Sequence, residues 1–538
     1  MSVESAAATG WEMRSHARLS PRRIGQHECS TRHVSKMFAA IIVVAGSSNL
    51  LVPTTAAQGA TLPPAGASSD TSIVGTTTPL PGPEYYFTVQ SAGTWTATNS
   101  DTDLIVDVTP TGLQFKSTDP AAGPVPVGLA LTRFGRSSSL SAVPSAAITA
   151  SGPALIMARG AVTEWCANGP GSIEHGMTIT SRPSGSGESM VLEFAITGPL
   201  HASVDDTGSV VQFRDDRNQT RVYYQELSAH DAVGSALTAR MVISPRILQI
   251  EVDDSIATYP VTIDPVVMST WGKKGTEPDG YFGYSLAIGD LNSDRVPDIV
   301  IGAPNFNTDG MIDPEEEGAV FVYQGIKGGL PSSAVKWKAK DGDGVPGVDG
   351  RLFGHALAVF DLGADGTNDL VIGAPGYDNG TLPDTGQAFI FKGKLMFVSN
   401  PSFTTSAQWQ KTGAVAKGAF GTSVANGFNL GGSNANDLLI GAPGWNGGSG
   451  PTGAAFVFYG GVSNGLPATT EDATLVGPQS GGRFGQSVGT ARDLNAMSPP
   501  FHFDVAVGEP GYDSGTYKDA GKVHVYYGPI SAGTHSRA

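Results

Sequence analysis

Residues 282–304 read FGYSLAIGDLNSDRVPDIVIGAP, and their pattern is the strongest indication of the architecture of the chain. It holds two short apolar runs, at 285–289 and 298–303, separated by a loop rich in Asp and Asn. Pro304 lacks an amide hydrogen and ends the second run. A third run, GAVFVYQG at 318–325, follows. Short β-type runs bounded by turn residues predict antiparallel strands joined by tight loops.

The same stretch recurs three more times. The Phe of its FG pair falls at Phe282, Phe353, Phe420 and Phe484, 64 to 71 residues apart. Weaker fourth segments contain Trp337 and Trp409, and a matching piece, MSTWGKK at 268–274, precedes the first copy. Units of four antiparallel strands repeated at this period predict the blades of a β-propeller. Because the last copy has no outer strand, we expect residues 268–274 to supply it and close the ring.

The FG pair, the GAP triplet and the acidic loop between them resemble the FG-GAP repeats of the integrin α-subunit head and of many secreted bacterial proteins. The resemblance covers residues 266–528. It implies a calcium-stabilised β-propeller, which usually has seven blades in that family. Four blades are recognisable here, which leaves a compact ring, an incomplete ring or extra blades from the N-terminal region as alternatives.

The first acidic loop, DLNSDRVPD, has the spacing of a calcium site. Asp290, Asn292, Asp294 and Asp298 stand at loop positions 1, 3, 5 and 9, and the carbonyl of Val296 stands at position 7. Oxygen ligands that include three carboxylates suit Ca²⁺. Position 6 is Arg rather than the Gly that would ease the turn. The alternative is an Asx-rich turn that only hydrogen-bonds itself.

The second loop, DLGADGTND, keeps Asp361, Asp365 and Asp369 and has Gly366 at position 6. Gly363 removes the position-3 ligand, so we expect a second calcium site in which water replaces that ligand. The third loop keeps one carboxylate, and the fourth has Met497 at position 5. We expect both of these to be metal-free. The separate acidic run at 341–349 is expected to be a solvated connector.

The rest of the chain divides by composition. Residues 1–57 combine a basic segment with the apolar run Met37–Ala45 and small residues near Ala57, which predicts a cleaved secretory signal peptide. Residues 58–83, rich in Pro, Thr and Ala, predict a linker. Residues 84–265 carry short alternating runs and predict a β-sandwich-like domain, and 529–538 is expected to be a tail. We expect a secreted or cell-surface protein with no transmembrane segment in the mature chain.

Charge and composition exclude several classes of protein. The chain has 33 Lys and Arg against 49 Asp and Glu, a net charge of −16, which argues against a nucleic-acid partner. With 71 Gly and 36 Pro, an all-α fold is excluded, and the fold class predicted is all-β. Removal of the signal peptide would leave Cys166 as the one cysteine, expected to be a buried thiol.

Enzyme signatures are weak. GQSVG at 485–489 matches a nucleophile elbow, but it aligns with first-strand sequence in the other copies. Glu164 with Glu174, or Asp205 with Asp206, could form a glycosidase pair. We expect a non-catalytic, calcium-binding adhesion or recognition protein whose propeller face binds an unidentified protein or glycan. The alternatives are an extracellular, carbohydrate-active hydrolase with catalysis in 84–265, and a structural envelope scaffold.

Overall fold

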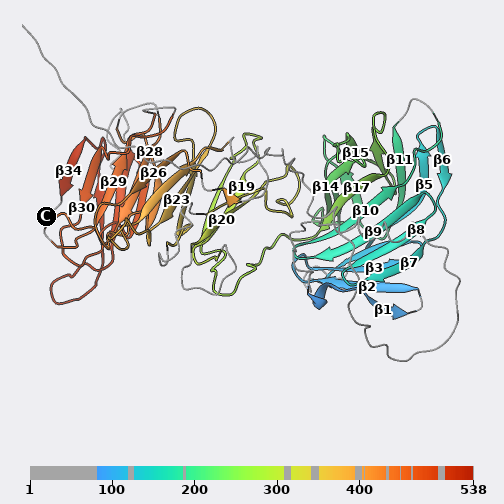
Figure 1. Ribbon diagram of the computed structural model, residues 1–538, viewed down its shortest axis with the longest axis horizontal. Helices are drawn as coiled ribbons and strands as arrows, with labels where there is room; N and C mark the ends of the chain where they lie inside the picture. Colours follow the sequence, from blue (N-terminus) through green and yellow to red (C-terminus); the bar gives the residue numbers. More distant parts are fainter. Residues whose placement is uncertain are drawn as a thin grey trace, which may run out of the picture. The chain divides into compact units, whose positions relative to one another are not determined.

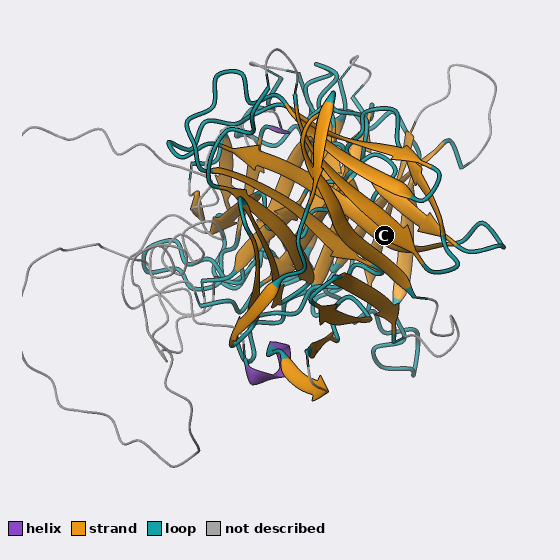
Figure 2. Cartoon of the chain, turned by 90° about the vertical axis from the view of Figure 1, so that its right-hand side faces the viewer, coloured by secondary structure: helices purple, strands orange, loops and turns teal. Residues whose placement is uncertain are grey.

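A computed structural model describes residues 82–536, apart from 92, 119–125, 186–188, 308–316, 341–350, 394–402, 405, 432–434, 449, 462–464 and 495–502. The predicted signal peptide, nearly all of the predicted linker and the acidic run at 341–349 lie outside these residues. The described part is almost wholly β-structure, as predicted, with one short 3₁₀ helix, η1 (Pro83–Tyr85) (Figures 1 and 2). None of its helices is long and apolar enough to cross a membrane.

The N-terminal half forms two antiparallel sheets. The first contains, in spatial order, β1 (Thr88–Ser91), β2 (Thr94–Asn99), β3 (Leu104–Thr109), β4 (Gly112–Ser117), β5 (Val127–Arg136), β11 (Met190–Thr197), β16 (Ile247–Val252) and β15 (Ala239–Ser244), with β6 (Ser139–Ala142) also paired to β5. The second contains β12 (His201–Val204), β13 (Val211–Arg214), β14 (Thr220–His230), β17 (Val261–Met268), β10 (Ser172–Ile179), β9 (Val162–Gly169), β8 (Ala154–Arg159) and β7 (Ala147–Ser151).

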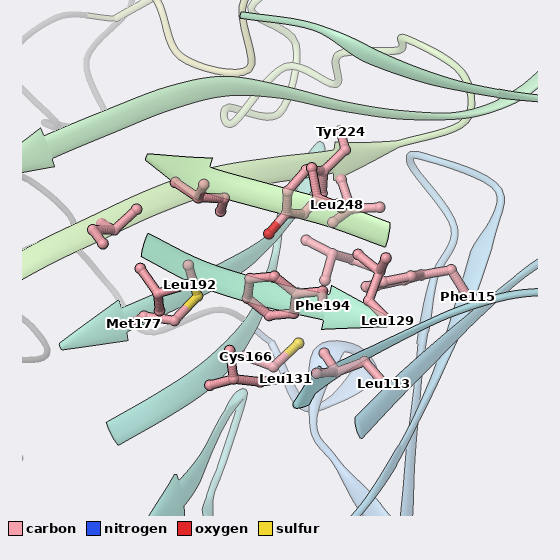
Figure 3. Packing of buried hydrophobic residues seen from close by; sticks show 14 of the residues in the cluster. Leu113, Phe115, Leu129, Leu131, Cys166, Met177, Leu192, Phe194, Tyr224 and Leu248 are labelled. Carbon is pink, nitrogen blue, oxygen red and sulfur yellow. The ribbon is translucent and has the colours of Figure 1, made fainter. Parts of the chain in front are cut away.

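One apolar core joins these two sheets. Leu129, Phe194 and Leu248 of the first sheet pack in the same buried cluster as Met177 and Tyr224 of the second (Figure 3). Side chains alternate between the two faces of a strand, so every second residue of these strands enters the core. The predicted alternation at Leu248, Ile250 and Val252 is confirmed, since all three are fully buried.

The four sequence repeats form four further sheets, here called blades 1 to 4. Blade 1 contains β18 (Ser285–Gly289), β19 (Asp298–Ala303), β20 (Ala319–Tyr323), β21 (Trp337–Lys340) and β25 (Phe403–Thr404). Blade 2 contains β22 (Ala356–Phe360), β23 (Asp369–Ala374), β24 (Gln387–Phe391) and β26 (Trp409–Thr412). Blade 3 contains β27 (Ser423–Phe428), β28 (Asp437–Ala442), β29 (Ala454–Phe458), β30 (Ala473–Val476) and β34 (Gly533–Ser536). Blade 4 contains β31 (Ser487–Arg492), β32 (Phe503–Glu509) and β33 (Lys522–Tyr526).

Successive blades pack face to face. The first strands β18, β22, β27 and β31 contact one another in that order. We call the face that a blade turns toward the following repeat its rear face, and the opposite one its front face. Between blades 1 and 2, for example, Val300 and Val320 of the rear face share a buried cluster with Ile372 and Phe389 of the front face.

The glycine of each GAP triplet permits this approach. A Cβ on Gly302 would lie 2.2 Å from the carbonyl oxygen of Gly354 in the next blade. Gly373 and Gly441 are equally close to the FG glycines of blades 3 and 4. No side chain fits there, because real Cβ atoms do not approach a backbone oxygen so closely. The glycine of the GAP triplet therefore serves the packing of one blade on the next.

The outer strands are arranged differently from the prediction. Residues 268–274 do not form the fourth strand of blade 4: Met268 ends β17, and within the described residues β33 pairs with β32 alone. Trp271 instead packs on Tyr323 of blade 1, with ring centroids 5.2 Å apart. The segment predicted as a tail contains β34, which pairs in parallel with β30 of blade 3.

Candidate metal-binding loops

The loop between β18 and β19 is held by its own side chains. Asp290 accepts hydrogen bonds from the amides of Asp294 (3.2 Å) and Arg295 (2.8 Å). Asn292 accepts one from the Asp294 amide and donates one to the Asp294 carboxylate (2.8 Å). Asp294 in turn accepts from the amide of Val296 (2.8 Å). This turn brings the residues at positions 1, 3 and 5 together, as the spacing predicts.

Asp298, at position 9, has a different environment. It is fully buried, and its two oxygens accept hydrogen bonds from the amides of Leu291 (2.9 Å) and Gly325 (2.9 Å). Burial raises the pKa of Asp298 to about 6, and the nearby charges of Asp294 and Asp290 also raise it, whereas the two amides oppose the rise. The carboxylate therefore ties the start of the loop to the end of β20.

The second loop repeats this geometry with one difference. Asp361 accepts from the amides of Asp365 (3.1 Å) and Gly366 (2.9 Å), and Lys392 donates to Asp365 (3.2 Å). Asp369 is buried, and its Oδ1 accepts from the amide of Gly393 (3.3 Å). Its Oδ2 is buried without a hydrogen-bond partner in the described part of the chain. Burial raises the pKa of Asp369 to about 6.

Position 6 requires a left-handed backbone in both loops. Gly366 has φ +80°, and Arg295, at the same position of the first loop, has φ +70°. The sequence identified Arg295 as the unfavourable residue, and the structure places it in that strained conformation. The first loop therefore adopts the same turn as the second at some cost in backbone energy.

The position-9 aspartate has a role that the sequence analysis missed. In the third loop, Asp437 accepts from the amides of Leu430 (2.6 Å), Gly431 (2.8 Å) and Gly460 (2.9 Å). In the fourth, Asp504 accepts from Leu494 (2.6 Å) and Gly528 (2.9 Å). The sequence does contain an indication of this structural role, because the aspartate remains in loops that have lost other acidic residues.

These loops are candidate cation sites, but their potential ligands are not gathered around one point. Among the described residues, no three Asp, Glu, His or Cys side chains are gathered as a metal ion would need. Nevertheless the donor set is chemically suitable, since a carboxylate oxygen that accepts one amide keeps a second lone pair. The unpartnered Oδ2 of Asp369 fits a cation best, because a buried carboxylate oxygen with no partner is costly. Asp290, Asn292, Asp294, the Val296 carbonyl and Asp298 would hold an ion in the first loop, and Asp361, Asp365 and Asp369 in the second.

The residues considered for catalysis do not converge. Ser487 begins β31 opposite Gly508, whereas His524 is paired with the adjacent Val507, so alternation puts the two side chains on opposite faces. The strand–turn–helix context of a nucleophile elbow is not found here, because a strand follows Ser487. Cys166 is buried, as expected, and burial raises the pKa of its thiol.

The candidate carboxylate pairs are also structural. Glu164 is fully buried and accepts from Arg159 Nε (2.6 Å), and His175 Nε2 lies 2.9 Å from its other oxygen. Glu164 pairs with Met177 across β9 and β10, and Glu174 pairs with Ala167, so the two glutamates point to opposite faces. Asp205 accepts from the amides of Ser209 and Val210 and closes a turn.

Comparison with known proteins supports the interpretation of the repeats. The model of the FG-GAP repeat matches residues 282–323 and 353–391, so the chain contains FG-GAP repeats, and an integrin-like β-propeller fold follows. Over 172 residues, 32% of this chain, it is 35% identical to integrin alpha-PS5 of Drosophila melanogaster, covering 16% of that protein. Over 254 residues, 46% of this chain, it is 28% identical to integrin alpha-5 of Xenopus laevis, covering 21% of that protein.

A further relative is an enzyme by name. The chain is 31% identical over 187 residues to phosphatidylinositol-glycan-specific phospholipase D of Bos taurus, covering 21% of that protein. In each of these three cases the chain spans about a fifth or less of the length of the relative it matches. The similarity therefore concerns only a part of each of these relatives.

Proposed function

We propose that this chain is an exported, non-catalytic recognition protein whose FG-GAP blades bind calcium and present a binding surface to a protein or glycan. The observation that supports the proposal is the pair of neighbouring loops in blades 1 and 2, in each of which the Asp at position 1 accepts hydrogen bonds from the amides of positions 5 and 6 while the Asp at position 9 is buried. Similarity to integrin α subunits supports a recognition role. The predicted signal peptide supports export to a calcium-containing environment.

The role of calcium would be mechanical. Without a cation, Asp290 and Asp294 lie near the buried Asp298 and raise its pKa, which means that the three carboxylates repel one another. A bound cation would offset this repulsion and fasten the β18–β19 hairpin. Binding to the folded state alone stabilises it by about 2.7 kcal/mol at a hundredfold excess of ligand over Kd.

A non-catalytic role agrees with the surroundings of the acidic residues. Glu164 is satisfied inside the core, Asp205 closes a turn, and Ser487 lies on the face opposite His524. A hydrolase needs a nucleophile or a pair of carboxylates that reach the same substrate atom. The residues considered for that task instead support the fold.

Calcium binding is tested by melting the full chain in EDTA and in millimolar CaCl₂. We expect calcium to raise the melting temperature. D290N and D361N, which change position 1 of the first and second loops, should each reduce the rise. D493N makes the same change in the fourth loop, expected to be metal-free, and should leave the rise unchanged. A melting temperature that is insensitive to calcium, in a sample free of bound metal, would contradict the proposal.

Recognition is tested separately by a screen of glycans and surface proteins, with and without calcium, beside a panel of hydrolase substrates. We expect a ligand whose binding weakens in EDTA and no turnover. Turnover that survives in D290N and D361N would favour the hydrolase alternative instead. Binding only to other envelope components would favour the scaffold alternative.

A further inference from the structure

At the two ends of the described blade series, apolar residues are exposed whose equivalents are covered at the internal blade junctions. On the front face of blade 1, Leu286 is 64% exposed and Ile288 is 67% exposed. Their equivalents in blade 2, Leu357 and Val359, pack against the rear face of blade 1. The front face of blade 1 thus has the composition of a junction surface but lacks a blade in front of it.

The rear face of blade 4 is the matching surface. Val523 is 69% exposed, whereas its equivalents Val320, Ala388 and Ala455 are fully buried against the next blade. Tyr527, just beyond β33, is 52% exposed. Scattered exposed apolar residues are ordinary, but these residues occupy the positions that are covered at the three internal junctions.

Hydrogen bonds between blades show the same difference between the internal junctions and the two end blades. At two junctions the serine that begins the first strand donates to the carbonyl of the next FG glycine, Ser285 to Gly354 (2.5 Å) and Ser423 to Gly485 (3.0 Å). Blade 4 keeps this serine as Ser487, and within the described residues it has no such acceptor. The corresponding acceptor is the carbonyl of Gly283, in the FG pair of blade 1, and among the described residues no serine of a preceding blade donates to it.

The backbone repeats this pattern. At each internal junction the amide of the FG phenylalanine donates to the preceding blade: Phe353 to Glu317 (3.2 Å), Phe420 to Thr385 (3.0 Å) and Phe484 to Thr452 (3.2 Å). By alignment, the fourth bond of this kind would join the amide of Phe282 to the carbonyl of Ala520. Gly508 is the GAP-triplet glycine of blade 4. In the described structure no FG glycine approaches it, whereas Gly354 closely approaches Gly302.

The outer strands complete the match. At the junctions of blades 1–2 and 2–3, an outer-strand tryptophan packs on the third strand of the following blade, Trp337 on Phe391 (5.1 Å) and Trp409 on Phe458 (5.6 Å). On blade 1 the same place is taken by Trp271, which belongs to the segment before the first repeat and not to a preceding blade. Blade 4 lacks an outer strand in the described residues. Blade 1 therefore carries beside it the tryptophan segment that blade 4 lacks.

We propose that blade 4 of one copy packs its rear face on the front face of blade 1 in a second copy of this chain. The junction would bury Val523 against Leu286 and Ile288, join Ser487 to the Gly283 carbonyl and set residues 269–274 of one copy beside β33 of the other. A second copy is the favoured partner because the front face of its blade 1 is equivalent to the front faces of blades 2, 3 and 4, which cover three rear faces within this chain. Head-to-tail contacts close into a ring when the rotation permits and otherwise extend.

The test is the mass of the full chain in solution, by sedimentation equilibrium up to about 100 μM, where contacts of modest affinity are populated. We expect the wild type to associate, and L286D and V523D each to lose at least tenfold in affinity. L286D keeps its rear face and V523D keeps its front face, so an equimolar mixture of the two should form a one-to-one pair. I256D, a change at an 81% exposed residue of the N-terminal half, should associate like the wild type.

Both aspartates would be introduced at exposed positions, so we expect each variant to fold. Circular dichroism and the melting temperature check that it does. A wild type that is monomeric throughout the concentration range would overturn the proposal. Association that persists equally in L286D and V523D would also overturn it, because another surface would then be responsible. So would a wild type that associates while the mixed variants do not.

Discussion

At the scale of single residues, blade 4 shows how a repeat can change two buried positions together. Its GAP triplet reads GEP, and Glu509 is fully buried. Its Oε2 accepts a hydrogen bond from His524 Nε2 (2.7 Å), and His524 stands where blades 1 to 3 have Phe321, Phe389 and Phe456. A buried carboxylate is tolerated only with a partner, so the exchanges of Ala for Glu and of Phe for His depend on each other.

A double-mutant cycle at this pair should show strong coupling. H524F leaves the Glu509 carboxylate buried without its partner, and we expect it to lower the free energy of unfolding by about 3–5 kcal/mol. The double variant E509A/H524F restores the residues of the other blades and should lie within about 1 kcal/mol of the wild type. Urea unfolding measures each free energy. Additive effects of the two changes would show that the pair is not coupled.

Asp264 is a half-buried carboxylate whose Oδ1 is buried, and it should make stability depend on pH. Burial and, to a smaller extent, the charge of Glu226 raise the pKa of Asp264 to about 7. Its Oδ1 has no hydrogen-bond partner in the described structure. Because the folded pKa lies above the unfolded value, the folded state binds more protons between these two values. Stability should therefore fall as the pH rises from about 4 through 7.

D264N tests this effect by removing the titration. Relative to the wild type, the variant should gain stability at pH 8 and show little gain at pH 4, as measured by urea unfolding at each pH. Glu174, whose pKa is also raised by burial and by the charge of Asp264, acts in the same direction. D205N, at a turn whose carboxylate pKa is lowered, is the control that should not gain stability at pH 8. An equal gain for D264N at both pH values would contradict the assignment.

At the scale of the structural element, the position-9 aspartate is a brace of the blade. Asp298, Asp437 and Asp504 each connect the start of the acidic loop to the glycine that follows the third strand. Amides at the ends of strands otherwise lack partners, and a carboxylate that accepts two or three of them satisfies several at once. The residue can therefore remain where calcium ligands have been lost.

D437N separates this brace from metal binding, since the third loop is expected to be metal-free. The amide group of Asn would present a donor where Leu430, Gly431 and Gly460 already donate. We expect a loss of about 1–3 kcal/mol in the free energy of unfolding, equal in EDTA and in calcium. N446A, in an exposed turn of the same blade, is a comparison for a local loss of hydrogen bonds. A loss that appears only in calcium would show that Asp437 binds the ion.

At the scale of the whole molecule, the residues that the structure describes belong to one compact unit, and loop 326–333 of blade 1 contacts the N-terminal sheets. The Gln225 side chain exchanges two hydrogen bonds with the backbone of Leu330 (3.0 and 2.9 Å), and Glu226 accepts from the amide and hydroxyl of Ser333 (2.6 and 2.9 Å). Gln225 is fully buried there. Nothing in the repeat pattern signals this contact, because its residues belong to segments with different sequence patterns.

The sequence by itself determined the repeated element. The FG pair, the acidic loop and the GAP triplet specify two strands joined by a turn, with a third strand after them. Three local constraints are enough for this: side chains alternate with a period of two along a strand, Pro ends a strand, and Asx residues favour a turn. It also placed Asp290, Asn292 and Asp294 together, since residues two apart in a tight turn are neighbours in any fold. The faces of Leu286 and Val523 follow from the alternation of side chains along a strand.

Only the tertiary structure decided which strand pairs with which edge. The pairing of β34 with β30, the open edge of β33 and the position of Trp271 on blade 1 depend on contacts between segments far apart in the chain, which no local pattern encodes. The burial of Asp298 and Asp369, which raises the pKa of each carboxyl, depends on the packing of neighbouring strands for the same reason. Local geometry determines the strands and turns of a blade, whereas contacts between distant segments determine which of its residues remain exposed.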